Sequence, residues 1–105
     1  MKALTMNIHS HPRKQEKEKY HRNIDLFTKY IIEQEIDVIA IQESSQTHTA
    51  PKVSKELLGS FVSCCEDTVI KEDNCTFLIS RKLEEMGVKH SFTWCCAKIG
   101  YNQYD

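Results

Sequence analysis

The sequence predicts an α/β fold that begins with a strand, a helix and a second strand. Two apolar segments, residues 3–8 and 38–42, have the composition of β-strands, and the segment between them has the spacing of a helix. The second segment is apolar at consecutive positions, which is typical of a strand covered on both faces in a layered sheet. We expect the two strands to be neighbours in one sheet, with the helix packed on it.

The helix is predicted for residues 16–34 from the spacing of its apolar side chains. These recur at intervals of four, three and four residues and so share one face. They are Tyr20, Ile24, Phe27 and Ile31, and the stripe is widened by Tyr30 and Ile32. The opposite face carries charges of both signs, as expected for a solvated surface. The apolar face should therefore be buried against the sheet.

A second helix is predicted for residues 75–86. Asp73 or Asn74 can cap its start, and Gly87 stands where a left-handed residue commonly ends a helix. Its apolar stripe is formed by Cys75, Ile79, Leu83 and Met86. Before it, residues 44–74 read as a long loop with a weakly helical piece near residues 52–58. After it, residues 88–99 alternate as a half-buried strand would, with Phe92 and Trp94 on the core face.

Composition excludes several classes of function. The 105 residues are 40% hydrophobic and 28% charged, with a formal net charge of -1 and a pI near 6.5, so no global field attracts nucleic acid or acidic membranes. The five cysteines include no CxxC spacing, which argues against a disulfide framework or a zinc site and favours a reducing, cytoplasmic environment. No segment reaches the length of a membrane span or a signal-peptide core.

Polar side chains follow both predicted strands of the first unit. Asn7 stands near the end of the first strand, and Gln42 and Glu43 end the second. A carboxylate on a rigid strand suits Mg²⁺, which takes one or two protein carboxylates and keeps several waters, and an amide oxygen adds a neutral ligand. From the pattern alone, Glu43 could equally be a loop residue and Asn7 a turn or cap residue.

Four segments together resemble the N-terminal half of the endonuclease/exonuclease/phosphatase superfamily, a group of Mg²⁺-dependent phosphoesterases. The first two are LTMN and DVIAIQE, which are separated by the predicted helix. The other two are IKEDN, which precedes the second helix, and FTWCCAKIGYNQYD, and these are similar to a bacterial subset of the superfamily. The resemblance implies the N-terminal portion of a two-sheet α/β sandwich. It also implies that Glu43 is the principal ligand of Mg²⁺, or of Mn²⁺ in its place, and that Asn7 is the metal-site asparagine.

The resemblance implies a phosphoester substrate, which in this superfamily is a nucleic acid, a nucleotide, a phospholipid head group or an inositol phosphate. Fold alone does not choose among these. His9, Gln42 and Lys98 are candidates for lining the substrate site, and His11 is a candidate beside His9 at its mouth. At Lys98 and Asn102 this chain departs from close relatives, which tend to carry histidine and aspartate there. The sequence indicates no obligate protein partner.

The superfamily's catalytic histidine, and the aspartate and asparagine that act on the water and the transition state, belong to its C-terminal half. Because this chain ends at Asp105, we expect residues 1–105 to be the N-terminal part of one domain, marginally stable and inactive alone. Two alternatives remain open. One is an inactive truncated remnant; the other is a small binding module with the same strand-helix-strand unit, for which the sequence shows no basic or aromatic surface.

Overall fold

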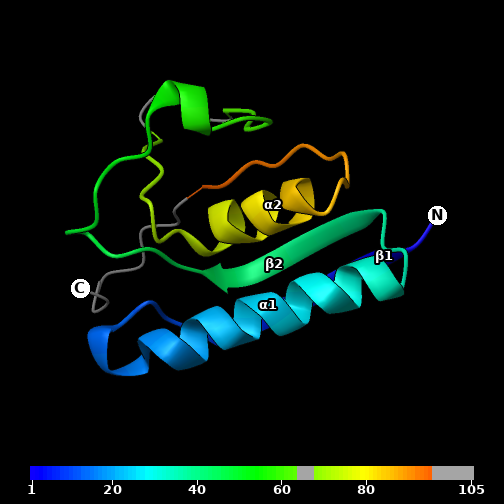
Figure 1. Ribbon diagram of the computed structural model, residues 1–105, viewed down its shortest axis with the longest axis horizontal. Helices are drawn as coiled ribbons and strands as arrows, with labels where there is room; N and C mark the ends of the chain where they lie inside the picture. The colour runs from blue at the N-terminus through cyan, green and yellow to red at the C-terminus, as the bar shows by residue number, and fades with distance from the viewer. Residues whose placement is uncertain (64–67, 96–105) are drawn as a thin grey trace.

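The computed structural model describes residues 1–63 and 68–95 of the chain. Its main elements follow the order β1 (Ala3–Ser10), α1 (Lys17–Glu33), β2 (Val38–Ser44) and α2 (Cys75–Glu85), with short 3-10 helices at Lys14–Glu16 and Lys55–Leu57. The two strands are parallel, and their register runs from Ala3 opposite Val38 to Asn7 opposite Gln42. The prediction of an α/β unit with these strands adjacent is confirmed (Figure 1).

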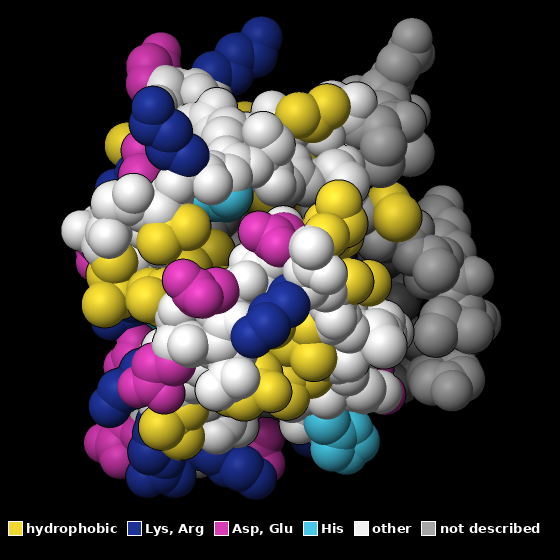
Figure 2. Space-filling view, turned by 90° about the vertical axis from the view of Figure 1, so that its right-hand side faces the viewer, with side chains coloured by type: hydrophobic (Ala, Val, Ile, Leu, Met, Phe, Trp, Pro, Cys, Tyr) yellow, Lys and Arg dark blue, Asp and Glu magenta, His cyan; other side chains and the backbone are white. Residues whose placement is uncertain are grey.

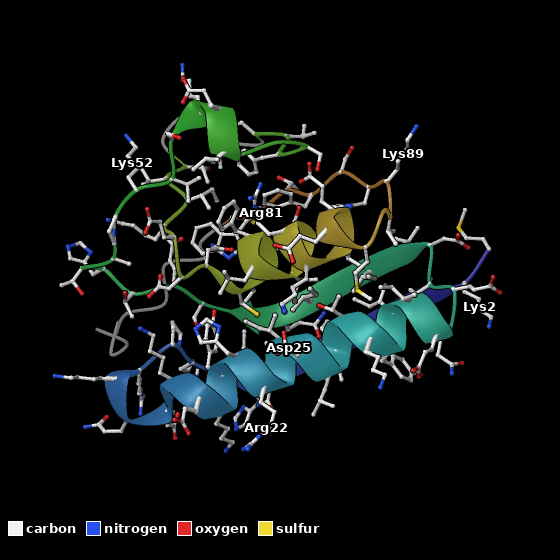
Figure 3. All side chains as sticks on the ribbon, in the orientation of Figure 1. Lys2, Arg22, Asp25, Lys52, Arg81 and Lys89 are labelled. Carbon is white, nitrogen blue, oxygen red and sulfur yellow. The ribbon has the colours of Figure 1, made fainter. Side chains whose placement is uncertain are left out.

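Both helices pack on the same face of the sheet. The predicted stripe of α1 is buried and meets α2 in one cluster, which rests on side chains of both strands. Its members are Tyr20, Ile24, Phe27 and Ile31 from α1, Cys75, Ile79 and Leu83 from α2, and Leu4, Ile8, Ile39 and Ile41 from the strands. At the surface Asp25 lies between the helices (Figure 3) and pairs with Lys82 of α2 at 2.8 Å. The hydrophobic cluster, rather than this exposed ion pair, holds the layers together.

The other face of the sheet is open. Val38, Ala40 and Gln42 of β2 are exposed, as are the residues opposite them in register on β1. The expectation that β2 is covered on both faces is therefore wrong for the described residues. The physical reason is that α1 and α2 both lie on the face of Ile39 and Ile41, so an apolar run does not by itself require two covering layers.

The start of α2 is capped as predicted. The Asn74 side chain accepts a hydrogen bond from the Phe77 N–H at 2.9 Å, which satisfies one of the free donors at a helix start. At the other end, Gly87 adopts φ 78°, a left-handed conformation. The N–H of Gly87 donates to the Glu84 carbonyl, and the N–H of Val88 donates to the Leu83 carbonyl, both at 3.0 Å. This is the Schellman pattern of helix termination.

A smaller core lies under the loops. Val53, Ile70 and Phe77 are buried there, and Phe92 and Trp94 pack against them, so Trp94 is a core residue as predicted. The strand expected over residues 88–99 is not present in its described part, residues 88–95, which forms only an isolated bridge between Phe61 and Phe92. Residues 96–99 of that prediction lie outside the described part of the chain. Exposure still alternates over residues 91–95, which is why the segment has the pattern of a strand.

Two smaller expectations are wrong. Tyr30 and Met86 are 45% and 60% exposed instead of extending the buried stripes. Tyr30 lines an open hollow between α1 and β1, and Met86 lies at the C-cap, where the chain leaves the helix direction. His90 is half-buried, and its Nε2 lies 2.6 Å from the Ser80 hydroxyl of α2.

The surface shows no single sign of charge over the face at which the strands begin. Figure 2 shows acidic and basic side chains interspersed there, with hydrophobic side chains between them. This agrees with the near-neutral composition. Within the described part of the chain, neither helix combines the length and apolarity that a membrane crossing requires.

Candidate metal site at the strand ends

Asn7 and Glu43 meet at the carboxyl ends of the two parallel strands. The Asn7 amide lies close enough to the Glu43 carboxylate to lower its pKa, so the structure brings together the two residues predicted to hold a metal. Two strands of regular conformation would not bring Asn7 and Glu43 together. Asn7 lies opposite Gln42, and side chains alternate between faces, so Glu43 would point to the opposite face.

The backbone at Glu43 and at His9 departs from the strand conformation. Glu43 has φ 57° and His9 has φ 44°, both in the left-handed region that side chains rarely adopt. The pairing of the strands also shifts between Asn7 and Ser10. These departures turn the Glu43 side chain toward Asn7. Strained backbone of this kind concentrates at functional sites, where surrounding contacts maintain it.

His9 completes a set of three hydrogen-bonded residues. Its Nδ1 lies 2.8 Å from Oε2 of Glu43, and its backbone N–H donates to Oδ1 of Asn7 at 2.9 Å. The His9 side chain is 83% exposed and that of Glu43 is 42% exposed. His9 therefore contacts the carboxylate directly, closer than the site-lining position expected from the sequence. One side of the carboxylate remains open to solvent.

The electrostatics of the site keep Glu43 ionised. The hydrogen bond from His9, followed by the nearby Asn7 amide, holds the pKa of the Glu43 carboxyl below its usual range. His11 lies beside the pair, with its ring centroid 6.4 Å from that of His9 and its Nδ1 3.2 Å from the Ser45 hydroxyl. Burial and the nearby Arg13 charge lower the pKa of His11. A neutral imidazole and an ionised carboxylate thus stand side by side at neutral pH.

The remaining candidates are placed differently. The Gln42 amide donates to the Thr5 hydroxyl at 2.9 Å and to the Ala40 carbonyl at 3.3 Å, so it lies along the open face of the sheet and turns back from Glu43. Lys98, together with Asn102, lies outside the described residues.

The loop after Glu43 is tied to the start of α2. The Ser44 hydroxyl lies 2.6 Å from that of Thr76 and accepts a hydrogen bond from the Thr76 N–H at 3.2 Å. One residue on, the Ser45 carbonyl accepts from the N–H of Cys75 at 3.0 Å. These bonds fix the chain immediately after Glu43 and so maintain the direction of its carboxylate.

A second set of contacts anchors the same loop farther along. The Asp73 carboxylate accepts hydrogen bonds from both the N–H and the hydroxyl of Thr47, and the Tyr20 hydroxyl donates to the Asp73 carbonyl at 2.7 Å. Burial raises the pKa of the Tyr20 hydroxyl, so it remains a donor. Gln46 accepts from the Asn74 amide at 2.9 Å. Sequence analysis missed these positioning residues because partners more than 20 positions apart leave no local pattern.

The donors at the strand ends are oxygen atoms, the kind that Mg²⁺ prefers in proteins. No three His, Cys, Asp or Glu residues gather into a metal-binding group within residues 1–63 and 68–95. The strand ends instead offer one carboxylate and one amide oxygen, on elements fixed by the sheet. Mg²⁺ accepts such a set because waters complete its octahedral shell, whereas structural Zn²⁺ needs four protein ligands.

Comparison of the chain with protein-family models, with curated proteins and with solved structures finds no match. Its function has therefore to be inferred from its own residues and their geometry.

Proposed function

We propose that this chain forms the metal-binding part of a Mg²⁺-dependent phosphoesterase of the endonuclease/exonuclease/phosphatase type. The observation that supports this best is the meeting of Asn7 and Glu43 at the ends of adjacent parallel strands, achieved through a left-handed residue at Glu43. When bound, Mg²⁺ would neutralise charge on the phosphoryl oxygens and the leaving oxygen of a phosphoester substrate.

The residues of the site have distinct roles in this proposal. Glu43 supplies the charged oxygen ligand, and Asn7 supplies a neutral oxygen that adds no repulsion between carboxylates. His9 orients Glu43 through its ring and Asn7 through its backbone N–H. Its exposed ring would line the side from which a nucleic acid, nucleotide or phospholipid head group approaches. Mn²⁺ would replace Mg²⁺, since both prefer oxygen ligands.

The open face of the sheet supports the two-sheet architecture of this superfamily. Ala3, Val38 and Ala40 expose small or apolar side chains on that face. A second sheet packed about 10 Å away would bury them and complete a sandwich with helices outside. We include this second sheet in the proposal for the whole domain.

Metal binding by residues 1–105 tests the proposal. Mn²⁺ added to the ¹⁵N-labelled chain should broaden the amide signals at the ends of β1 and β2, and Mg²⁺ should reverse the effect by competition. Glu43→Gln and Asn7→Ala should each weaken Mn²⁺ binding by about tenfold or more, a typical cost of disturbing a metal site. Glu56→Gln, at an exposed carboxylate of the 3-10 helix Lys55–Leu57, is the matched control. Unchanged binding by Glu43→Gln would overturn the proposal.

A further inference from the structure

The outer edge of β1 is unpaired in the described part of the chain. β1 hydrogen-bonds β2 on one side only, and no other described strand adjoins it. Between Lys2 and His9 the strand carries neither a charged side chain nor a proline, the usual means by which proteins protect an edge. Its free backbone donors and acceptors can therefore pair with another strand.

An apolar hollow of about 390 Å³ lies beside this edge, between β1 and α1. Met6 of β1 and Leu26 of α1 line it, and they are 38% and 61% exposed. The other lining residues are Leu4 and Ile8 of β1 and Asn23, Phe27 and Tyr30 of α1. The hollow and the free edge form one continuous surface with Met6 and Leu26 at its centre.

We propose that a second copy of this chain covers that surface, forming a two-fold symmetric dimer. The β1 strands pair antiparallel about Met6, which sets Leu4 of each copy beside Ile8 of the other. The result is a continuous four-stranded sheet. The α1 helices lie antiparallel and in contact at Leu26, on the same face of that sheet. Strands about 4.8 Å apart and helices about 8–10 Å apart are the spacings that this arrangement requires.

Charge on α1 favours a second copy as the occupant. Lys19 and Glu33 are exposed, and each stands seven positions from Leu26, two helical turns away on the same side of the helix. In an antiparallel pair centred on Leu26, Lys19 of one copy lies opposite Glu33 of the other, and symmetry repeats the contact. The surface therefore matches a second copy of itself: apolar side chains meet at its centre, and opposite charges meet on either side. A two-fold interface requires this self-complementarity.

Sedimentation equilibrium of the full chain under reducing conditions tests the dimer. The chain should sediment as a concentration-dependent dimer, and Leu26→Glu should weaken dimerisation by about tenfold or more, as expected at the centre of an interface. Lys19→Glu should weaken it, and the double variant Lys19→Glu with Glu33→Lys should restore it. Circular dichroism checks folding, since the altered side chains are exposed.

Ala40→Lys is the matched control, because Ala40 lies on the open face of the sheet and on β2, away from the free edge. It should leave the dimer intact. A monomer at all concentrations would overturn the inference. So would a dimer that survives Leu26→Glu and is lost in Ala40→Lys, since that result would place the contact on the open face. Neither outcome depends on metal binding, so the proposed function is tested separately.

Discussion

Nδ1 of His9 lies 2.8 Å from a carboxylate oxygen of Glu43, and both residues have left-handed backbone conformations at the ends of neighbouring strands. The relationship explains how a site forms at this edge. Alternation along β2 would direct Glu43 away from Asn7, and the turn at Glu43 redirects it. The hydrogen bond from His9 then stabilises the strained conformation.

His9→Ala should raise the pKa of Glu43. The hydrogen bond from His9 is the largest cause of the lowered pKa, so its loss moves the carboxyl back toward its ordinary value. Carbon-detected NMR titration of the side-chain carboxyl measures the shift. Asn7→Ala should move the pKa in the same direction by less. A larger shift in Asn7→Ala than in His9→Ala would contradict this order of causes.

The same pKa shift has a defined sign in stability. A carboxyl whose pKa is lower in the folded state stabilises the fold above its unfolded pKa, and this contribution is lost as the pH falls through the folded pKa. The free energy of unfolding of His9→Ala should therefore decrease less on acidification than that of the unaltered chain. Urea unfolding at a series of acidic pH values measures this difference.

The local sequence pattern predicted the helices and strands better than it predicted what packs against them. The spacing of Tyr20, Ile24 and Phe27 predicted the helix and its buried face, and Asn74 and Gly87 predicted the limits of α2, since these features act within a few residues. The open face of the sheet could not be predicted, because an apolar run does not state how many layers cover it. The expected strand after Gly87 was wrong over its described residues, because alternation in exposure does not require a partner strand.

The candidate site was predictable in its members but not in its geometry. The polar residues at the predicted strand ends indicated Asn7 and Glu43. Regular alternation of side chains along the strands, however, would have placed the two on opposite faces of the sheet. The left-handed conformation of Glu43 and the anchoring of Ser44 to Thr76 depend on contacts across the fold. Such contacts join residues far apart in the sequence, so they become visible only in the structure.

Glu35→Gly should stabilise the chain. Glu35 follows the C-cap of α1 with φ 52°, and its N–H donates to the Ile32 carbonyl at 3.2 Å, while the N–H of Ile36 donates to Ile31 at 3.1 Å. This is the Schellman pattern seen at Gly87, but with a side chain in the position that favours glycine. Relief of the left-handed strain should raise the free energy of unfolding by up to about 1 kcal/mol.

The reverse change at Gly87 is the control for that experiment. A Cβ at Gly87 meets no atom within 4 Å, so Gly87→Ala tests the backbone alone. It should lower the free energy of unfolding by about 1 kcal/mol. Urea denaturation measures both variants. A destabilised Glu35→Gly beside an unaffected Gly87→Ala would refute the assignment of strain to these two positions.

Thr28→Val should also stabilise the chain. Thr28 is 2% exposed in α1, and its hydroxyl has no hydrogen-bond partner among the described residues. Replacing it with an isosteric methyl group removes a buried unsatisfied hydroxyl, which should raise the melting temperature and add about 1 kcal/mol to the free energy of unfolding. Thr76→Val is the contrast, because the Thr76 hydroxyl bonds Ser44 and its removal should destabilise. Equal effects of the two changes would exclude this explanation.

Cys75 should make the fold sensitive to alkaline pH. Burial raises the pKa of its thiol from 9.0 to about 11, so the unfolded thiol ionises between those values while the folded thiol does not. Stability from this group is complete below pH 9 and is lost as the pH rises toward 11, by about 2–3 kcal/mol in total. Urea midpoints at pH 8, 9 and 10 measure the loss. Cys75→Ala should abolish the loss of stability below pH 10. Above pH 10 Tyr20, whose pKa is also raised, contributes to the loss.

Residues 1–105 alone should show no appreciable phosphoesterase activity. In the proposed site Glu43 and Asn7 are metal ligands, and neither can take a proton from the attacking water while serving as a ligand. General-base assistance is typically worth about 10²- to 10⁴-fold, and loss of donors to the transition state costs a similar factor. The combined deficit should place turnover below detection. The assay adds Mg²⁺ or Mn²⁺ and offers a generic phosphodiester and an abasic DNA. Metal-dependent turnover that Glu43→Ala abolishes would show that these residues suffice for catalysis.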